Sequence, residues 1–109
     1  MVAKGGAMAT VPMTLLTIIA EELLEPRLLR TLRDAGISAY TATPARGEGE
    51  RGLRQGATGA NVRIETITTT EVAEGLIDQL SARYFENYAI IAWLSEVRVA
   101  RPEKYQPHG

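Results

Sequence analysis

The 109-residue sequence predicts a single α+β domain in which four strands and two helices follow one another in the order β-α-β-β-α-β. Two observations support this fold class. Short runs rich in β-branched residues flank two segments whose apolar residues recur every three or four positions. The composition, 45% hydrophobic and 23% charged, is that of an ordinary globular protein long enough to bury its own core.

The first half of the domain reads as strand, helix and strand. Residues 13–20 form an apolar run that suits one buried strand. Pro26 favours a helix start, because its fixed φ suits the first turn. The apolar stripe that follows consists of Leu28, Leu29, Leu32 and Ala35. Gly36 is placed to end this helix in the left-handed conformation, and residues 37–43 alternate as a second strand.

The second half repeats this pattern. Residues 61–67 alternate as a third strand, and Thr68 with Glu71 has the spacing of a capping box. The helical stripe behind the cap is Val72, Ala73, Leu76, Ile77, Leu80 and Tyr84. Residues 89–94 are apolar on both faces of a last strand, which indicates a subunit interface. This order is typical of a ferredoxin-like fold, with a four-stranded antiparallel sheet and both helices on one face.

We expect residues 1–12 to be a flexible leader or a cloning remnant, 13–101 the folded domain and 102–109 a loosely held tail. A long loop, 44–60, holds half of the ten glycines and three arginines. Glycine backbone N–H groups and arginine side chains suit phosphate or carboxylate, although a solvated surface loop remains the alternative. The loop matches G-x-G-x-x-G in outline, but a strand follows it where a dinucleotide site requires a helix.

Several function classes are disfavoured by composition. A net charge of −1 without a basic stripe gives no reason to expect nucleic acid, and the absence of cysteine excludes disulfides and thiolate chemistry. The one histidine, His108, lies beside the C-terminus, so no common nucleophile–base pair can form. The adjacent acids Glu21 and Glu22 read as a solvated face, and no spacing argues for a metal site. Tyr88 could cover an adenine or belong to the core, whereas Trp93 favours interface or core packing. We expect a protein that is not an enzyme.

Taken together, these segments resemble the PII signalling-protein superfamily, and within it the PII-like branch linked to carboxysomes and bicarbonate transporters. The resemblance covers residues 14–101 and rests on the segments Asp34-Ala35-Gly36, Tyr40-Thr41, Gly47 to Arg54, Asn61 to Glu65 and Tyr84 to Ala89. It implies a homotrimer with adenine nucleotides in the clefts between subunits, and makes 44–60 the T-loop that contacts a partner protein. The absence of cysteine fits a cytoplasmic location. The binding residues that it implies are Gly36, Thr41, Arg46, Gly47, Gly49, Arg51, Arg54, Glu65, Ile67, Tyr88, Ala89, Ile90, Arg98 and Arg101.

Departures from the classical nitrogen-regulatory members change the expected ligand. Their Gly-Asp-Gly-Lys B-loop reads Glu86-Asn87-Tyr88-Ala89 here, and their modified T-loop tyrosine has no counterpart in 44–60. Their Mg-ATP-binding glutamine aligns with Arg51, which cannot ligate Mg²⁺ as an amide oxygen can. We therefore expect ADP or AMP, with bicarbonate as a candidate second ligand and a transporter or carboxysome partner. The alternatives are a nitrogen-type sensor of ATP and 2-oxoglutarate, a dimeric enzyme acting on a small organic anion, and a trimer that binds protein alone.

Overall fold

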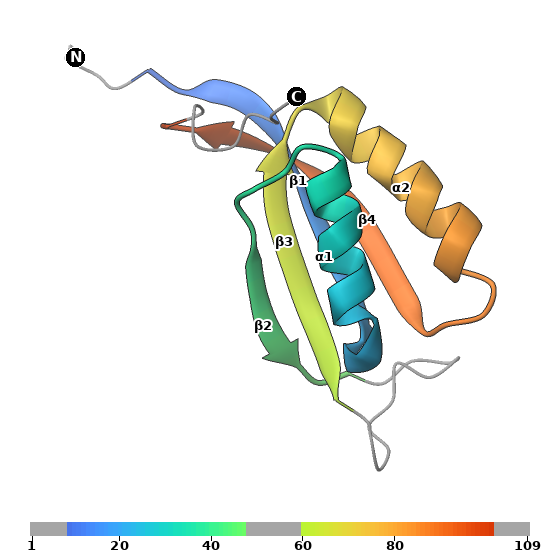
Figure 1. Ribbon diagram of the computed structural model, residues 1–109. Coiled ribbons are helices and arrows are strands. Elements are labelled where there is room, and N and C mark those ends of the chain that lie inside the picture. The colour runs from blue at the N-terminus through green and yellow to red at the C-terminus, as the bar shows by residue number, and fades with distance from the viewer. Residues whose placement is uncertain (1–8, 48–59, 102–109) are drawn as a thin grey trace.

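The chain alternates strands and helices in the predicted order, as Figure 1 shows for the computed structural model. The structure describes residues 9–47 and 60–101. Its elements are β1 (Val11–Glu21), a 3₁₀ turn (Glu22–Leu24), α1 (Glu25–Asp34), β2 (Thr41–Ala45), β3 (Asn61–Thr68), α2 (Thr70–Tyr84) and β4 (Ile90–Val99). The strands form one antiparallel sheet in the order β2-β3-β1-β4, and both helices cover the same face of it. The ferredoxin-like fold is confirmed.

The strand register gives the sheet a covered and an open face. Ile18 lies opposite Ile64 on one side and Ala92 on the other, and both isoleucines are completely buried beneath the helices. Because consecutive side chains of a strand alternate between faces, Ile91 and Trp93 lie on the open face. They are 48% and 38% exposed. The last strand is therefore apolar on both faces, as the sequence predicts, and one of those faces is uncovered in the single chain.

The second strand begins later than predicted. It covers Thr41–Ala45 instead of 37–43, and residues 37–40 form an irregular segment. Ile37 is buried in the core, and its N–H donates to the carbonyl of Leu32 at 3.0 Å, so this segment closes α1 before it can pair with β3. The predicted loop likewise begins too early, because Pro44 belongs to β2. A proline is tolerated there because β2 is an edge strand.

One helix end was predicted correctly and one was not. Gly36 has a φ of 89° and its N–H donates to the carbonyl of Arg33, which confirms the left-handed end of α1. The cap of α2 is Thr69, whose Oγ1 accepts from the N–H of Val72, so the capping box at Thr68 is wrong by one residue. Thr68 cannot serve as the cap because it continues the β-ladder opposite β1 and its side chain is fully buried.

The sheet extends beyond β3 as a ribbon of β1 and β4. These two strands pair from Val11 onward, whereas pairing between β1 and β3 begins at Thr14 (Figure 1). The expected leader, 1–12, is therefore too long by at least Val11 and Pro12. Within the described ranges, no helix has the length and apolar character needed to cross a membrane.

Candidate functional site

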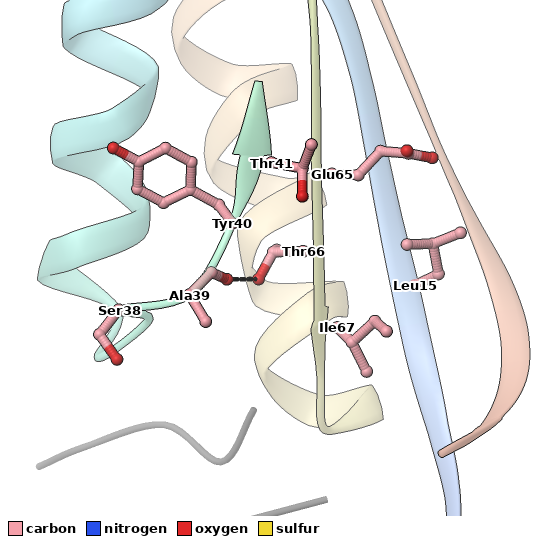
Figure 2. A pocket seen from close by; sticks show the side chains of 8 residues that line it. All are labelled: Leu15, Ser38, Ala39, Tyr40, Thr41, Glu65, Thr66 and Ile67. Carbon is pink, nitrogen blue, oxygen red and sulfur yellow. Dashed lines mark hydrogen bonds between the residues drawn. The ribbon is translucent and has the colours of Figure 1, made fainter. Parts of the chain in front are cut away.

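An open groove lies at the β2 edge of the sheet, where the irregular segment 38–40 enters β2 (Figure 2). Its volume is about 550 Å³. The residues that line it are Leu15, Ser38, Ala39, Tyr40, Thr41, Glu65, Thr66 and Ile67. Aliphatic and aromatic surface combined with a few hydroxyls and one carboxylate is the composition expected of a site for an organic ligand.

The shape of the groove follows from one hydrogen bond and the strand register. Thr66 Oγ1 donates to the carbonyl of Ala39 at 2.7 Å, which ties the segment before β2 to β3 (Figure 2). The ladders then place Thr41 opposite Glu65, and Leu15 opposite Ile67. Backbone pairing among three strands therefore sets the positions of the strand residues of the groove, and the bond from Thr66 holds the segment 38–40 beside them.

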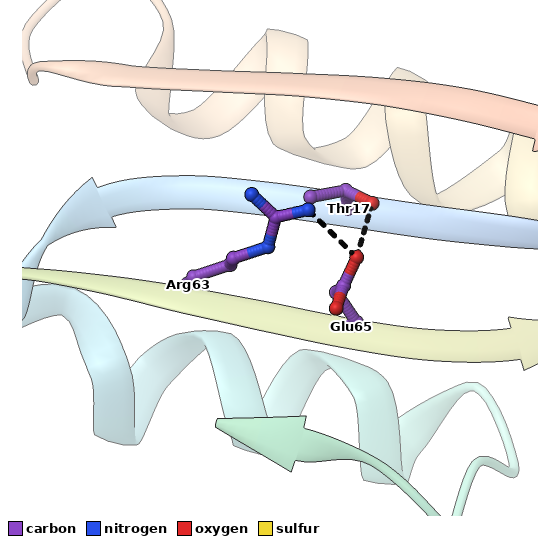
Figure 3. Close-up of polar contacts among 3 residues, drawn as sticks. All are labelled: Thr17, Arg63 and Glu65. Atoms are coloured by element: carbon purple, nitrogen blue, oxygen red, sulfur yellow. Dashed lines mark hydrogen bonds and ion pairs between the residues drawn. The ribbon is translucent and has the colours of Figure 1, made fainter. Parts of the chain in front are cut away.

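Glu65 is held by two donors on the open face of the sheet (Figure 3). Its Oε2 accepts from Thr17 Oγ1 at 3.0 Å and from Arg63 Nη2 at 3.1 Å. The hydrogen bond from Arg63, assisted by that from Thr17, lowers the pKa of Glu65 against the opposing effect of partial burial. The carboxylate is therefore ionised at neutral pH. Both bonds engage Oε2, so Oε1 is the oxygen with which Glu65 can accept from the N–H or hydroxyl groups of a ligand.

The same arginine connects the groove to the exposed part of the sheet. The guanidinium carbon of Arg63 lies 5.8 Å from the centre of the Trp93 ring, within cation–π range. The register explains this neighbourhood, because Glu65 lies opposite Thr17 and Thr17 lies opposite Trp93. One row of side chains therefore runs across the open face from the groove at β2 to β4. Arg63 and Glu65, two residues apart on β3, form an ion pair along this one strand, at 3.1 Å.

The turn before β4 forms a second cluster. The hydroxyl of Tyr88 accepts from Arg27 at the start of α1 at 3.3 Å, and the guanidinium carbon of Arg27 lies 5.9 Å from the Tyr88 ring centre. The ring also meets Tyr84 edge-on at 5.9 Å between centroids. Tyr88 packs against the core in this arrangement, which is the core role that the sequence left open.

Glu21 closes the same turn. Its Oε2 accepts from the N–H of Ala89 at 2.7 Å, and its own N–H donates to the Ala89 carbonyl at 3.2 Å. The interpretation of Glu21 and Glu22 as a solvated face holds for the exposed Glu22 and is wrong for the half-buried Glu21. No local pattern indicates this contact, because its partners are 68 residues apart in the chain.

One chain brings together only part of the predicted binding set. Thr41, Glu65 and Ile67 share the groove, and Gly36 lies close before it in the chain. Ile90 instead pairs with Ala20 at the far end of the sheet, together with the preceding turn. Ala20 in turn pairs with Val62 of β3, which lies three residues, or about 10 Å, along the strand from Glu65. The turn precedes β4 and the groove borders β2, and these two strands are opposite edges of the sheet. The groove and the turn are therefore separate in one subunit.

The remaining predicted residues that the structure describes lie outside both clusters. Arg46 is exposed where β2 ends, and a Cβ at Gly47 would meet nothing within 4 Å. Arg98 lies on the β1–β4 ribbon, where its Nε donates to Thr10 Oγ1 at 3.0 Å, and Arg101 is exposed just after β4. Three predicted residues lie outside the described part of the chain: Gly49, Arg51 and Arg54.

Sequence reasoning missed several residues of both clusters. Thr17, Leu15 and Ser38 were not among the predicted binding residues, although the alternation within residues 13–20 places the first two on one face. Among the residues that the structure describes, no group of three His, Asp or Glu side chains is placed to hold a metal ion.

The comparisons with known proteins agree with this architecture. The family model described as nitrogen regulatory protein P-II matches residues 13–104. The chain is similar to the crystal structure of a PII-like signalling protein from Thermus thermophilus, at 48% identity and a TM-score of 0.79. That match covers 90% of this chain and 99% of the other.

Two further structures show the same fold at lower identity. Both are of CPII from Thiomonas intermedia K12, described as a nitrogen regulatory PII-like protein, one bound to ADP, AMP and bicarbonate and one to ADP and bicarbonate. Each is 24% identical to this chain, with TM-scores of 0.80 and 0.81. They cover 92% and 91% of this chain, and the match spans 99% of each of the two CPII chains. With its family match over nearly the whole folded domain, the chain belongs to the PII family and to its PII-like branch.

Proposed function

We propose that this protein is a homotrimeric, non-catalytic sensor of ADP and AMP in the cytoplasm, with bicarbonate as a second ligand. The groove at the β2 edge carries this proposal, because Thr41 and Ile67 meet there beside the ionised carboxylate of Glu65. CPII, which shares the fold, is described as bound to ADP, AMP and bicarbonate. An adenine amino group or ribose hydroxyl would donate to Glu65 Oε1, and Leu15 and Ile67 would cover the apolar surface of the nucleoside.

The separation of the two clusters supports a site shared between subunits. A phosphate bound near the turn at Tyr88 and a nucleoside in the groove cannot both belong to one pocket of one chain. The exposed apolar side chains of Ile91 and Trp93 give each subunit a face that another copy would cover. Assembly would then bring the groove of one subunit close to the turn of its neighbour.

The loop 44–60 would transmit the ligand-binding signal to a partner protein. Nucleotide phosphates and bicarbonate would neutralise Arg46, Arg51 and Arg54, and the loop would adopt a different conformation with each ligand. A bicarbonate transporter or a carboxysome component would bind this changed surface of the loop. Such a switch requires that the ligands differ in affinity for the two loop states, so AMP, ADP and ATP should act unequally.

Calorimetric titration of AMP, ADP and ATP, with and without bicarbonate, tests the proposal. We expect ADP and AMP to bind more tightly in bicarbonate, and Arg51→Ala to lose this gain. Thr41→Val should weaken binding in either buffer, because it removes a hydroxyl from the groove while keeping the shape of the side chain. Arg30→Ala is the matched control for Arg51→Ala and should leave binding unchanged, since Arg30 is an exposed arginine on α1 outside the groove. Absence of binding by all three nucleotides would refute the sensor.

A nitrogen-type sensor is the second candidate, because the matching family model is described as nitrogen regulatory protein P-II. That function requires Mg-dependent binding of ATP together with 2-oxoglutarate. The same calorimetry with Mg²⁺ and 2-oxoglutarate separates the two. Tighter ATP binding in their presence would favour the nitrogen-type function over the one proposed here.

A further inference from the structure

The backbone amides of the turn before β4 are already engaged. The N–H groups of Asn87 and Tyr88 both donate to the carbonyl of Tyr84, at 3.2 and 3.0 Å. The N–H of Ala89 donates to the side chain of Glu21 at 2.7 Å, a short distance typical of a bond to a charged acceptor. An anion that approached this turn would therefore find its backbone donors occupied.

Glu21 Oε2 takes the Ala89 N–H, a donor that a phosphate oxygen could otherwise accept from. Turn amides that point outward are ordinary ligands of phosphate, and a carboxylate is a chemical substitute for it. The bond that Glu21 accepts comes from a neutral amide, so its negative charge is retained at the turn. A second bond, from the Glu21 N–H to the Ala89 carbonyl, fixes the carboxylate in position.

The turn is not closed to every anion, because a cation lies beside it. The exposed guanidinium of Arg27 contacts Tyr88 both by a hydrogen bond and over its ring. An incoming phosphate would be attracted by Arg27 and repelled by Glu21. Both interactions grow with the charge of the incoming group, so Glu21 offsets part of the attraction that Arg27 exerts on each added phosphate.

We infer that Glu21 determines nucleotide selectivity, by holding the Ala89 N–H and placing a negative charge where the terminal phosphates of a larger nucleotide would lie. This inference rests on the proposed nucleotide site, and it adds to that site a residue that disfavours ATP relative to AMP and ADP. It explains selectivity by a residue at the end of β1 that touches the turn, without any difference in the adenosine contacts.

Glu21→Gln separates the charge from the structural role. Glutamine can still accept from the Ala89 N–H through its amide oxygen, so the hydrogen bond that holds the turn (the clamp) is kept while the charge is lost. We expect the ratio of ATP to AMP affinity, measured by calorimetry on the full chain, to rise on the order of tenfold, as for removal of a repulsive charge a few ångströms from a phosphate. Glu22→Gln is the matched control, because it removes an adjacent and exposed carboxylate, and it should leave the ratio unchanged.

If Glu21 acted only by holding the turn in place, and not through its charge, the variants would behave differently. Glu21→Ala removes both charge and clamp, so a selectivity change in this variant but not in Glu21→Gln would overturn the inference. So would an unchanged ratio in Glu21→Gln when the unmodified protein binds nucleotides. Thermal unfolding of each variant identifies loss of folding. Failure of the unmodified protein to bind any nucleotide is a distinct result, which would refute the proposed function and this inference with it.

Discussion

Trp93 provides a test of whether other copies of the chain cover the open face of the sheet. Its side chain is 38% exposed in the single chain. A tryptophan can bury up to about 250 Å², so covering the exposed part would remove roughly 95 Å² from water. At about 25 cal/mol per Å², this is about 2.4 kcal/mol for each subunit and roughly 7 kcal/mol for a trimer. Trp93→Ala should therefore lower the trimer association constant by about 10⁵-fold.

Sedimentation velocity over a concentration series measures this change directly. The unmodified protein should sediment as a trimer, and Trp93→Ala should dissociate at concentrations where the trimer otherwise persists. Phe85→Ala is the matched control, because Phe85 is a similarly exposed aromatic, at 41%, but lies at the end of α2 instead of on the open face. A trimer that survives Trp93→Ala unchanged, or that Phe85→Ala weakens equally, would refute this reasoning.

Two further predictions concern stability. Glu65→Gln should lower the free energy of unfolding by at most about 1 kcal/mol at neutral pH, because both members of the Arg63–Glu65 pair are partly exposed. The folded-state pKa of Glu65 lies below the ordinary value of 4.5, so this contribution is fully present above that pH and is lost as the pH falls through the folded pKa. Urea unfolding should show the difference from the unmodified protein shrinking on acidification, and a difference that grows would contradict the assignment. Thr69→Ala should lower the free energy of unfolding by about 1 kcal/mol in the same assay, because the hydrogen bond from the Val72 N–H is lost. Thr69→Ser keeps the hydroxyl and should retain most of this stability. Equal losses in both variants would rule out the cap.

Local patterns predicted the elements well where the cause of each lies within a few residues. Gly36 ends α1 because the backbone there needs a positive φ, and this requirement is visible in the sequence itself. Pro26 lies in the first turn of the helix that it was expected to start. The errors at Thr68 and at residues 37–43 share one origin. In both places a contact with a distant strand or with the core decided where the element begins, and a single sequence does not contain that information.

The candidate site was less accessible to the same reasoning. Thr41, Glu65 and Ile67 were grouped through the family resemblance, and the antiparallel register explains why they are neighbours. Glu21 and Glu65 look alike in the sequence, as carboxylates near apolar strands. One accepts from a backbone amide 68 residues away, and the other from a threonine 48 residues away and an arginine two residues away. Tertiary partners alone distinguish a carboxylate that is fixed from one that is solvated.

The contacts of Arg63 bear on whether ligand binding and assembly can be independent. One guanidinium holds the carboxylate that borders the groove and lies against the aromatic ring on the open face. Covering Trp93 would remove water from Arg63 and so strengthen its attraction to Glu65, because both interactions are screened less in a lower dielectric. A ligand that forms a hydrogen bond with Glu65 would in turn change the attraction between Glu65 and Arg63, and with it the contact of Arg63 with Trp93. If copies of the chain cover this face, ligand binding and assembly are coupled through Arg63, since groups in one contact network are not energetically additive.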